Sequence, residues 1–208
     1  MSAMPILYRD EHLIALDKPA GLLAVPGRGA EKFDSLATRV QAEFPSATIV
    51  HRLDQETSGV MVMALHADVH RHIQQQFEKR QTEKRYIAVV AGVFAEDAGE
   101  INLPLANMFE NPPRHVVEFE RGREAITHWR VLERLADRTR LELRPLTGRS
   151  HQLRVHLSHI GHPILGDSLY APPEVQSLAA RLLLHAEMLC IEHPATREKL
   201  TLHSACPF

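Results

Sequence analysis

The chain carries the stretch HRLDQETSGVMVMAL at residues 51–65, in which a polar turn leads into an apolar run. The run at 60–65 has the length and composition of a buried strand. Asp54 lies in the turn, two residues after Arg52. Because loops held by rigid elements are where chemistry is usually placed, Asp54 is the first candidate for an active-site residue. The alternative is that Asp54 only forms the turn, by accepting hydrogen bonds from nearby backbone N–H groups.

Strands predominate on both sides of this stretch. Period-two alternation and bounding turn residues predict strands at 6–8, 12–16, 60–65, 86–93, 116–119, 125–132, 139–143, 181–191 and 199–202. Helices are predicted after Asp34 or Ser35, around 69–77 and after Ser150. Short strands in series with few helices favour an α+β fold with a mixed, mostly antiparallel sheet flanked by helices. The proline- and glycine-containing segment 109–124 is expected to project from the sheet as a hairpin or flap.

Composition supports a single globular domain spanning residues 1–208. Hydrophobic residues make up 44% and charged residues 24%, which excludes disordered and fibrous classes. No run is long enough for a membrane span and no signal pattern opens the chain, so we expect a cytoplasmic protein without a membrane partner. The two cysteines, Cys190 and Cys206, support neither a disulfide framework nor a cysteine zinc site.

The net charge of −2 argues against long-range attraction to nucleic acid. The local distribution of charge differs. Residues 138–156 contain five arginines against the single acid Glu142, and a phosphate-facing patch requires only local charge of this kind.

Arg149 belongs to the segment TGRSHQLRVH at 147–156, where Ser150 is predicted to cap a helix. The inward stripe of this helix is predicted to consist of Leu153, Leu157 and Ile160. A cation just before a helix N-terminus is disfavoured by the helix dipole. The position of Arg149 is therefore reasonable if an acid or a phosphate lies nearby, and a screened surface arginine is the alternative.

Tyr86 and the histidines are two further groups of candidate functional residues. Tyr86 opens an apolar strand and is either an ordinary strand aromatic or a face for a nucleobase with a hydroxyl for proton handling. The fourteen histidines include His156, His159 and His162, but no His-Glu-x-x-His pattern or cysteine pair accompanies them. A metal site is therefore disfavoured.

Taken together, these segments resemble the pseudouridine synthases of the RluA type. The resemblance rests on residues 51–59, on Lys84-Arg85-Tyr86 and on residues 147–156, followed by blocks at 18–21, 161–167 and 184–186. It covers nearly the whole chain and is greatest for the RluA subgroup itself. No separate amino-terminal RNA-binding domain is expected before the catalytic domain.

The resemblance implies the catalytic fold of that family and the isomerisation of uridine to pseudouridine. The subgroup modifies a stem-loop of large-subunit ribosomal RNA and the anticodon stem-loop of some tRNAs. By resemblance, Asp54 acts at the ribose as a nucleophile or as a base. Arg149 pairs with Asp54 and keeps it ionised, and Tyr86 stacks on the base and handles a proton. The reaction needs neither a metal nor another cofactor.

Substrate contacts are expected from four more residues. Arg52 is placed to fill the stack that a flipped uridine vacates. Leu153 is a candidate for the apolar wall, and His51 and Arg154 are expected to bind substrate. The expected partner is structured RNA rather than DNA, bound by a monomer. The competing functions are a non-catalytic RNA-binding protein or RNA chaperone, and a histidine-ligated metallohydrolase.

Overall fold

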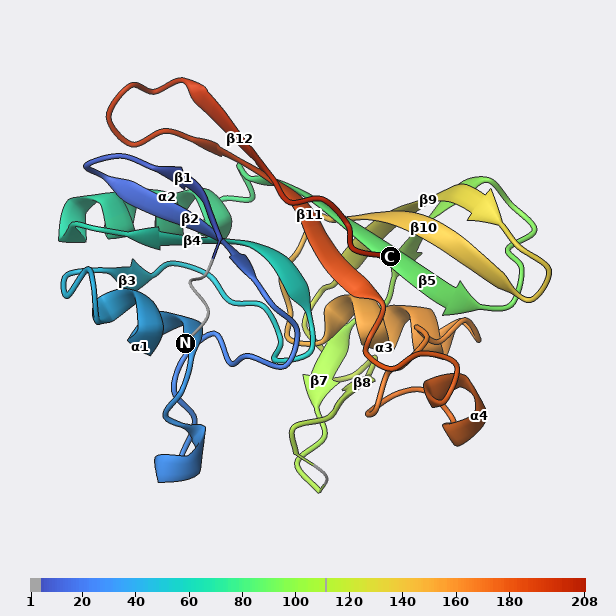
Figure 1. The fold of residues 1–208 in the computed structure, drawn as a ribbon. Helices are drawn as coiled ribbons and strands as arrows, with labels where there is room; N and C mark the ends of the chain where they lie inside the picture. Colours follow the sequence, from blue (N-terminus) through green and yellow to red (C-terminus); the bar gives the residue numbers. More distant parts are fainter. Residues whose placement is uncertain (1–4, 111) are drawn as a thin grey trace. The chain divides into compact units, whose positions relative to one another are not determined.

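The computed structural model describes residues 5–110 and 112–208, which form two compact units (Figure 1). Unit 1 comprises the chain up to Lys84 together with Ala186–Pro207, and unit 2 comprises Arg85–His185 with Phe208. Strands β5 (Glu83–Ala91) and β11 (Leu184–Glu192) run through the boundary between the units. The prediction that residues 1–208 are a single domain stays a prediction.

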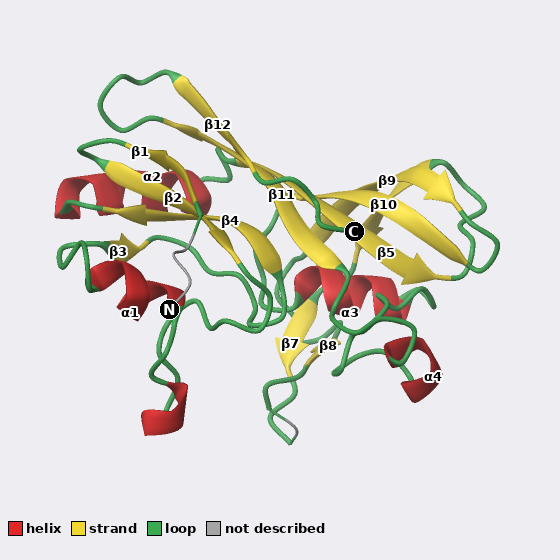
Figure 2. Ribbon diagram, viewed as in Figure 1, coloured by secondary structure: helices red, strands yellow, loops and turns green. Residues whose placement is uncertain are grey.

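Unit 1 is an antiparallel sheet packed against two helices (Figure 2). Its elements are β1 (Ile6–Arg9), β2 (Leu13–Lys18), the short 3-10 helix η1 (Ala30–Lys32), α1 (Leu36–Gln41), β3 (Thr48–Ile49), β4 (Ser58–Ala64), α2 (Ala67–Glu78) and β12 (Lys199–His203). Strand β2 pairs with β1 and β4, and β12 pairs with β11. Every residue of β4 is buried, which explains why its sequence is continuously apolar rather than alternating.

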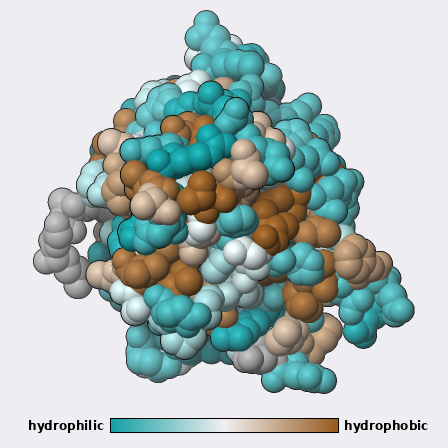
Figure 3. Space-filling model, turned by 90° about the vertical axis from the view of Figure 1, so that its right-hand side faces the viewer, coloured by the Kyte–Doolittle hydropathy of each residue, from teal (hydrophilic) through white to brown (hydrophobic). Residues whose placement is uncertain are grey.

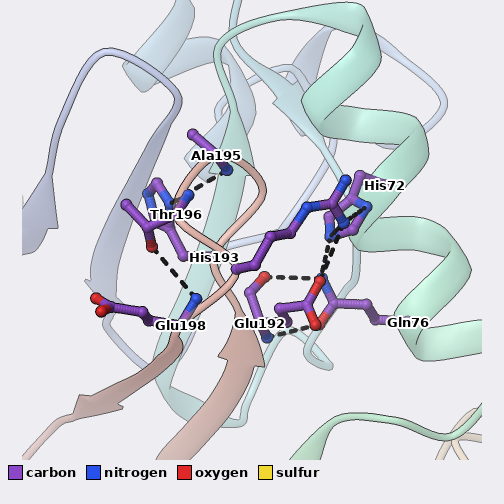
Figure 4. A network of polar contacts seen from close by, with 8 residues as sticks. His72, Gln76, Glu192, His193, Ala195, Thr196 and Glu198 are labelled. Atoms are coloured by element: carbon purple, nitrogen blue, oxygen red, sulfur yellow. Dashed lines mark hydrogen bonds and ion pairs between the residues drawn. The ribbon is translucent and has the colours of Figure 1, made fainter.

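Helix α2 is fastened to β11 by both apolar and polar contacts. Val69 and Ile73 enter the same buried cluster as Leu189 of β11. The side-chain amide of Gln76 donates to the carbonyl of Glu192 at 2.8 Å and accepts from its N–H at 2.7 Å (Figure 4). Gln76 thus satisfies both backbone groups of a strand residue, as a neighbouring strand would.

Unit 2 is a second antiparallel arrangement in the strand order β5-β10-β9-β6, with helix α3 packed against it. Its other elements are β6 (Ala98–Asn102), β7 (Leu105–Asn107), β8 (His115–Val117), β9 (Ile126–Arg134), β10 (Arg138–Pro145), α3 (Gln152–His159) and α4 (Pro173–Gln176). Leu153 and Leu157 of α3 share a buried cluster with Leu141 and Leu143 of β10.

Strands β7 and β8 form a projecting hairpin that begins at Leu105, four residues before the segment 109–124 for which the sequence predicts one. We call residues 105–124, which contain these strands and the turns that follow them, the flap. Asn111, within the predicted hairpin segment, lies outside the described residues.

The α+β class is confirmed, and each predicted strand and helix is present with its ends shifted by a few residues. Strands β3, β6 and β7 escaped prediction because they are short or exposed. In β6 only Ile101 is buried, so no alternation marks the strand. The inward stripe of α3 is wrong at its end, since Ile160 lies beyond the helix and is exposed.

Exposed apolar side chains remain on unit 2, and one face of the molecule shows apolar patches bordered by hydrophilic residues (Figure 3). The large apolar side chains of unit 2 that are exposed include Val93, Leu132, Leu135, Leu146, Ile160 and Leu178.

Among residues 5–110 and 112–208, no helix has the length and hydropathy that crossing a bilayer requires.

Candidate active site

The loop that carries Asp54 is held on both sides by buried residues. Leu53 is buried before it, and Thr57 and Ser58 are buried at the entry to β4. The N–H of Thr57 donates to the carbonyl of Asp54 at 3.2 Å, which closes the turn. The Asp54 side chain itself is partly exposed. The turn-forming role that sequence suggests for this loop and a chemical role for the carboxylate are therefore compatible.

A fully buried lysine fixes the next residue of this loop. Lys18 has no exposed surface, and its ammonium donates to the carbonyls of Pro19, Leu22 and Gln55 at 2.9, 2.8 and 3.0 Å. Gln55 and Gly21 also exchange hydrogen bonds, at 2.9 Å from the Gly21 N–H and 3.0 Å from the Gln55 amide. Lys18 therefore joins the end of β2 to the residue that follows Asp54.

The role of Lys18 is not apparent from the sequence, because Asp17-Lys18-Pro19 is most simply a strand-ending turn. The alternation of residues in β2 does indicate that Lys18 is buried. Period-two alternation places Lys18 on the same face of β2 as Ile14 and Leu16, both of which are buried. A lysine in line with buried residues needs acceptors for its three N–H bonds, and carbonyls of nearby turns supply them.

His51 supports the sheet from inside unit 1. Its Nε2 accepts from the N–H of Val62 at 3.0 Å, and its ring stacks on Phe77 with centroids 4.8 Å apart. Burial, reinforced by the positive charge of Lys84, lowers the pKa of His51 from 6.5 to about 4. The imidazole is therefore neutral at pH 7, with Nε2 as the acceptor. The predicted contact of His51 with substrate stays a prediction. Arg52, the next residue, is exposed.

In unit 2, Tyr86 and Leu153 are brought together. Tyr86 lies on β5 opposite Leu143 of β10 and is partly exposed. Its ring packs against the buried cluster that contains Leu153. Tyr86 therefore has an apolar side fixed against the core and an exposed remainder, as a stacking surface requires.

Arg149 is held at its backbone and at its side chain. Its N–H donates to Oε1 of Gln152 at 3.0 Å, and its Nε donates to the carbonyl of Glu124 at 3.0 Å. The Gln152 amide is itself buried and bonded to Thr147 at 2.8 Å and to Thr127 at 3.0 Å. The segment that presents Arg149 is thus anchored to the interior of unit 2.

The predicted cap of helix α3 is wrong. The N-cap is His151 rather than Ser150, and it has left-handed backbone angles with φ 55°. His151 makes no side-chain capping hydrogen bond, and the Gln152 amide accepts from the N–H of Arg149, which lies before the helix. Serine matches the usual N-cap preference, but Ser150 precedes the observed N-cap by one residue.

Arg154 is buried, and its predicted contact with substrate stays a prediction. Only 3% of Arg154 is exposed, and its guanidinium binds Asp167 through two bonds of 2.8 and 2.6 Å. The same guanidinium lies over the ring of Tyr170, 5.2 Å from its centroid. Arg154 is therefore a buried structural residue that ties α3 to the segment after it.

Other arginines of the 138–156 stretch also bind groups of the protein. Arg144 and Arg130 both pair with Glu142, and these arginines lower the pKa of this partly buried carboxyl against the opposing effect of desolvation. Arg138 pairs with Asp137, and Arg140 donates to the carbonyl of Phe208. The continuous phosphate-facing patch expected from sequence is thus partly neutralised.

The described part of the chain contains no group of three or more histidine, cysteine, aspartate or glutamate side chains arranged to hold a metal ion. His156, one of the suspected ligands, is buried. Its ring nitrogens contact Thr127 Oγ1 and the carbonyl of Leu103, both at 3.0 Å.

The predicted site residues divide between the units. His51, Arg52 and Asp54 belong to unit 1, and Tyr86, Arg149 and Leu153 belong to unit 2. The pairing of Asp54 with Arg149 therefore stays a prediction.

Comparison with known proteins decides the family. The profile of the family described as RNA pseudouridylate synthase matches residues 12–159. The chain belongs to this family. The dual-specificity RNA pseudouridine synthase RluA of Yersinia pestis is 52% identical over 192 residues, which cover 92% of this chain and 93% of the relative. RluA of Escherichia coli K12 is 48% identical over 204 residues, which cover 98% of this chain and 93% of the relative.

Solved structures agree with the fold of this pseudouridine synthase. Human RNA pseudouridylate synthase domain containing 1 superposes with a TM-score of 0.83 at 27% identity, covering 99% of this chain and 84% of the human chain. Human RNA pseudouridylate synthase domain containing 4 gives 0.78 at 30% identity, covering 97% and 88%. The protein is an RluA-type pseudouridine synthase, an isomerase that modifies RNA.

The buried ion pair of Arg154 leads to a stability prediction. In Arg154→Met, the carboxylate of Asp167 stays buried without its guanidinium, and the free energy of unfolding should fall by about 3–5 kcal/mol, measured by urea denaturation. Arg138→Met, which removes an exposed ion pair, is the matched control and should leave stability unchanged within error. Equal stability of the two variants would contradict the structural assignment of Arg154.

His51 should make stability depend on pH. Folded His51 takes up its proton near pH 4, whereas unfolded histidine does so near 6.5, so the unfolded state binds more protons as pH falls below about 6.5. Between pH 7.5 and 5 this difference should lower the free energy of unfolding by about 2 kcal/mol. Urea denaturation at both pH values should show a smaller decrease for His51→Gln. The exposed control His203→Gln should keep the wild-type decrease, and an unchanged decrease in His51→Gln would exclude His51 as its source.

Proposed function

We propose that the protein isomerises uridine to pseudouridine in stem-loops of both large-subunit ribosomal RNA and tRNA. The observation that carries this proposal is the identity of 48–52% over almost the whole chain to relatives named as dual-specificity RNA pseudouridine synthases. The matched region, 92–98% of this chain, spans loops as well as the core, and loops are where target recognition is placed. We further propose that it acts as a monomer in the cytoplasm, where its proposed RNA substrates lie.

The reaction exchanges one glycosidic bond for another. The bond from the anomeric carbon to uracil N1 breaks, the detached base turns, and a bond from the same carbon to C5 forms. The proton lost from C5 is balanced by a proton gained at N1, so no oxidant, reductant or water is consumed. The site must therefore hold the base and exclude water, because water would hydrolyse the nucleoside rather than isomerise it.

In this proposal Asp54 acts at the ribose, either by attack on the anomeric carbon or by removal of a neighbouring proton. The closed turn between Leu53 and Thr57 supports this role, because it fixes the backbone while leaving the carboxylate partly exposed. A single carboxylate suffices, since uracil departs as an anion and remains in the site. Glycosidases, which lose their leaving group to solvent, use two carboxylates.

Arg149 is proposed to pair with Asp54 and to keep it ionised and oriented. Its support is the double anchoring at Gln152 and Glu124, which holds the guanidinium in place before substrate arrives. Tyr86 is proposed to stack on uracil, with Leu153 behind it, and to take part in removing the C5 proton. The exposed Arg52 is proposed to enter the space that the flipped uridine leaves, because its planar guanidinium can stack between bases.

Substitution of Asp54 tests the proposed chemistry. Asp54→Asn should lower pseudouridine formation by at least about 100-fold, because an amide is neither an ionised nucleophile nor a base. RNA binding should survive, since the amide has nearly the same shape as the carboxylate. Release of tritium from 5-tritiated uridine measures turnover on large-subunit ribosomal RNA and tRNA stem-loops. Glu56→Gln, in the same loop, is the control and should retain activity. Near-normal turnover in Asp54→Asn would refute the mechanism.

Substitution of Arg149 tests whether its positive charge, proposed to be held next to Asp54, is needed for turnover. Arg149→Leu should lower turnover by about 10- to 100-fold, because Asp54 loses a charge-assisted partner. The measurement is single-turnover kinetics at saturating enzyme, which separates the chemical step from RNA binding. Arg138→Leu, which removes a partly exposed arginine of the same unit, is the control and should keep the wild-type rate. Equal losses in the two variants would indicate that both arginines only bind phosphate.

The target RNAs are tested separately from the chemistry. Pseudouridines mapped across ribosomal RNA and tRNA, in cells with and without the protein, should disappear from sites in both RNA classes. Loss from only one class would reject dual specificity and leave the isomerase activity standing.

A further inference from the structure

The flap and the segment that presents Arg149 are joined at two points. The first is the hydrogen bond from Arg149 Nε to the carbonyl of Glu124, the last residue of the flap, at 3.0 Å. The second lies at the start of β8, where the N–H of His115 donates to the hydroxyl of Tyr170 at 2.8 Å. That hydroxyl lies 2.7 Å from Nδ1 of His151, two residues after Arg149.

The Tyr170 oxygen accepts a hydrogen bond from the N–H of His115. The bond between the Tyr170 hydroxyl and Nδ1 of His151 can run in either direction according to the tautomer of His151, because a hydroxyl donates one bond and accepts two. The hydroxyl thus joins His115 and His151. Ring contacts accompany the bonds, since the His151 ring lies edge-on to Tyr170 at 5.6 Å and to His115 at 5.2 Å.

His151 occupies a backbone conformation that residues with a Cβ adopt uncommonly. Its φ of 55° and ψ of 15° lie in the left-handed region, and it is the N-cap of α3. This conformation turns the chain from Arg149 into the helix, where the N–H of Val155 donates to the carbonyl of His151 at 2.9 Å. A left-handed residue of this kind persists when its surroundings hold it, and the ring of His151 is held by Tyr170 and His115.

Tyr170 is a fixed reference point for this turn. Its N–H donates to Asp167 Oδ1 at 3.1 Å, and its carbonyl accepts from Ser158 Oγ at 2.9 Å. Its ring lies over the guanidinium of Arg154. The hydroxyl is thus aimed by backbone bonds at both ends of the residue and by the packing of its ring.

We propose that Tyr170 and His151 are positioning residues for Arg149. The Tyr170 hydroxyl holds His151 in its left-handed turn and ties the flap to that turn. Arg149 is then set by the turn through its backbone and by the end of the flap through its side chain. This inference rests on the proposed role of Arg149. Tyr170 and His151 act on turnover through Arg149, whereas RNA affinity depends on other contacts.

The test removes a single oxygen. Tyr170→Phe keeps the ring over Arg154 and loses both hydroxyl bonds, so kcat should fall by about threefold to tenfold. The Kd for the RNA stem-loop should stay within about twofold of the wild-type value. Tyr8→Phe is the matched control, because the Tyr8 hydroxyl also makes a partly buried bond, to Asp10 at 2.9 Å in unit 1, and this variant should keep the wild-type kcat.

A second pair of variants distinguishes a positioning role of His151 from a general loss of local structure. His151→Asn keeps a side-chain hydrogen-bonding group and a residue type that tolerates left-handed angles, whereas His151→Ala has neither. Asn should restore most of the kcat that Ala loses. The double variant Tyr170→Phe/His151→Ala should lose less than the product of the two single losses, since the bond between Tyr170 and His151 is broken in both single variants.

Three results would overturn the inference. The first is an unchanged kcat in Tyr170→Phe, and the second is a loss confined to Kd, which would make the hydroxyl a support for RNA binding only. The third is a loss of kcat that vanishes when activity is divided by the folded fraction of each variant. Failure of the roles proposed for Asp54 and Arg149 is separate, because it would appear in Asp54→Asn and Arg149→Leu while the wild-type protein still forms pseudouridine.

Discussion

The buried ammonium of Lys18 is the constraint on which the candidate site depends. Its three N–H bonds are satisfied by the carbonyls of Pro19, Leu22 and Gln55, so the end of β2 and the loop before β4 are joined at one point. A buried charge costs much free energy unless its hydrogen bonds are complete, which makes this arrangement intolerant of displacement. The residue next to Asp54 is therefore placed by the interior of unit 1 rather than by the loop alone.

In unit 2, neutral hydrogen-bonding groups rather than a buried charge fix the residue proposed to act in the site. The Gln152 amide reaches Thr127 and Thr147 in the interior and receives the N–H of Arg149 at the surface. In both units a buried polar side chain links the core to a residue beside a candidate functional group. Such links hold a side chain in a productive geometry before substrate binds, which lowers the cost of reaching the transition state.

The buried ion pair of Arg154 and Asp167 shows that two arginines of one sequence segment can have different roles when only one of them is buried. Arg149 and Arg154 stand in one basic segment, and by composition they are equally suited to bind phosphate. Burial separates them, because Arg154 lies in the part of α3 in which every residue from 152 to 157 is buried, whereas Arg149 precedes the helix and is partly exposed. The isomerase therefore uses similar cations for different purposes, one to join elements of unit 2 and one as a candidate for chemistry.

The sequence by itself determined the α+β class, nearly every long strand and helix, the flap and the family, because apolar periodicity, turn residues and ordered motifs are local properties of the chain. It did not reveal the role of Lys18, the left-handed His151, the buried contacts of Gln152, or the burial of Arg154. Only the tertiary structure decided these, because each involves at least one partner distant in the sequence, such as Gln55 for Lys18, Tyr170 for His151 and Thr127 for Gln152. Hydrogen-bond partners of buried polar groups are chosen by the fold, and local sequence carries no record of them.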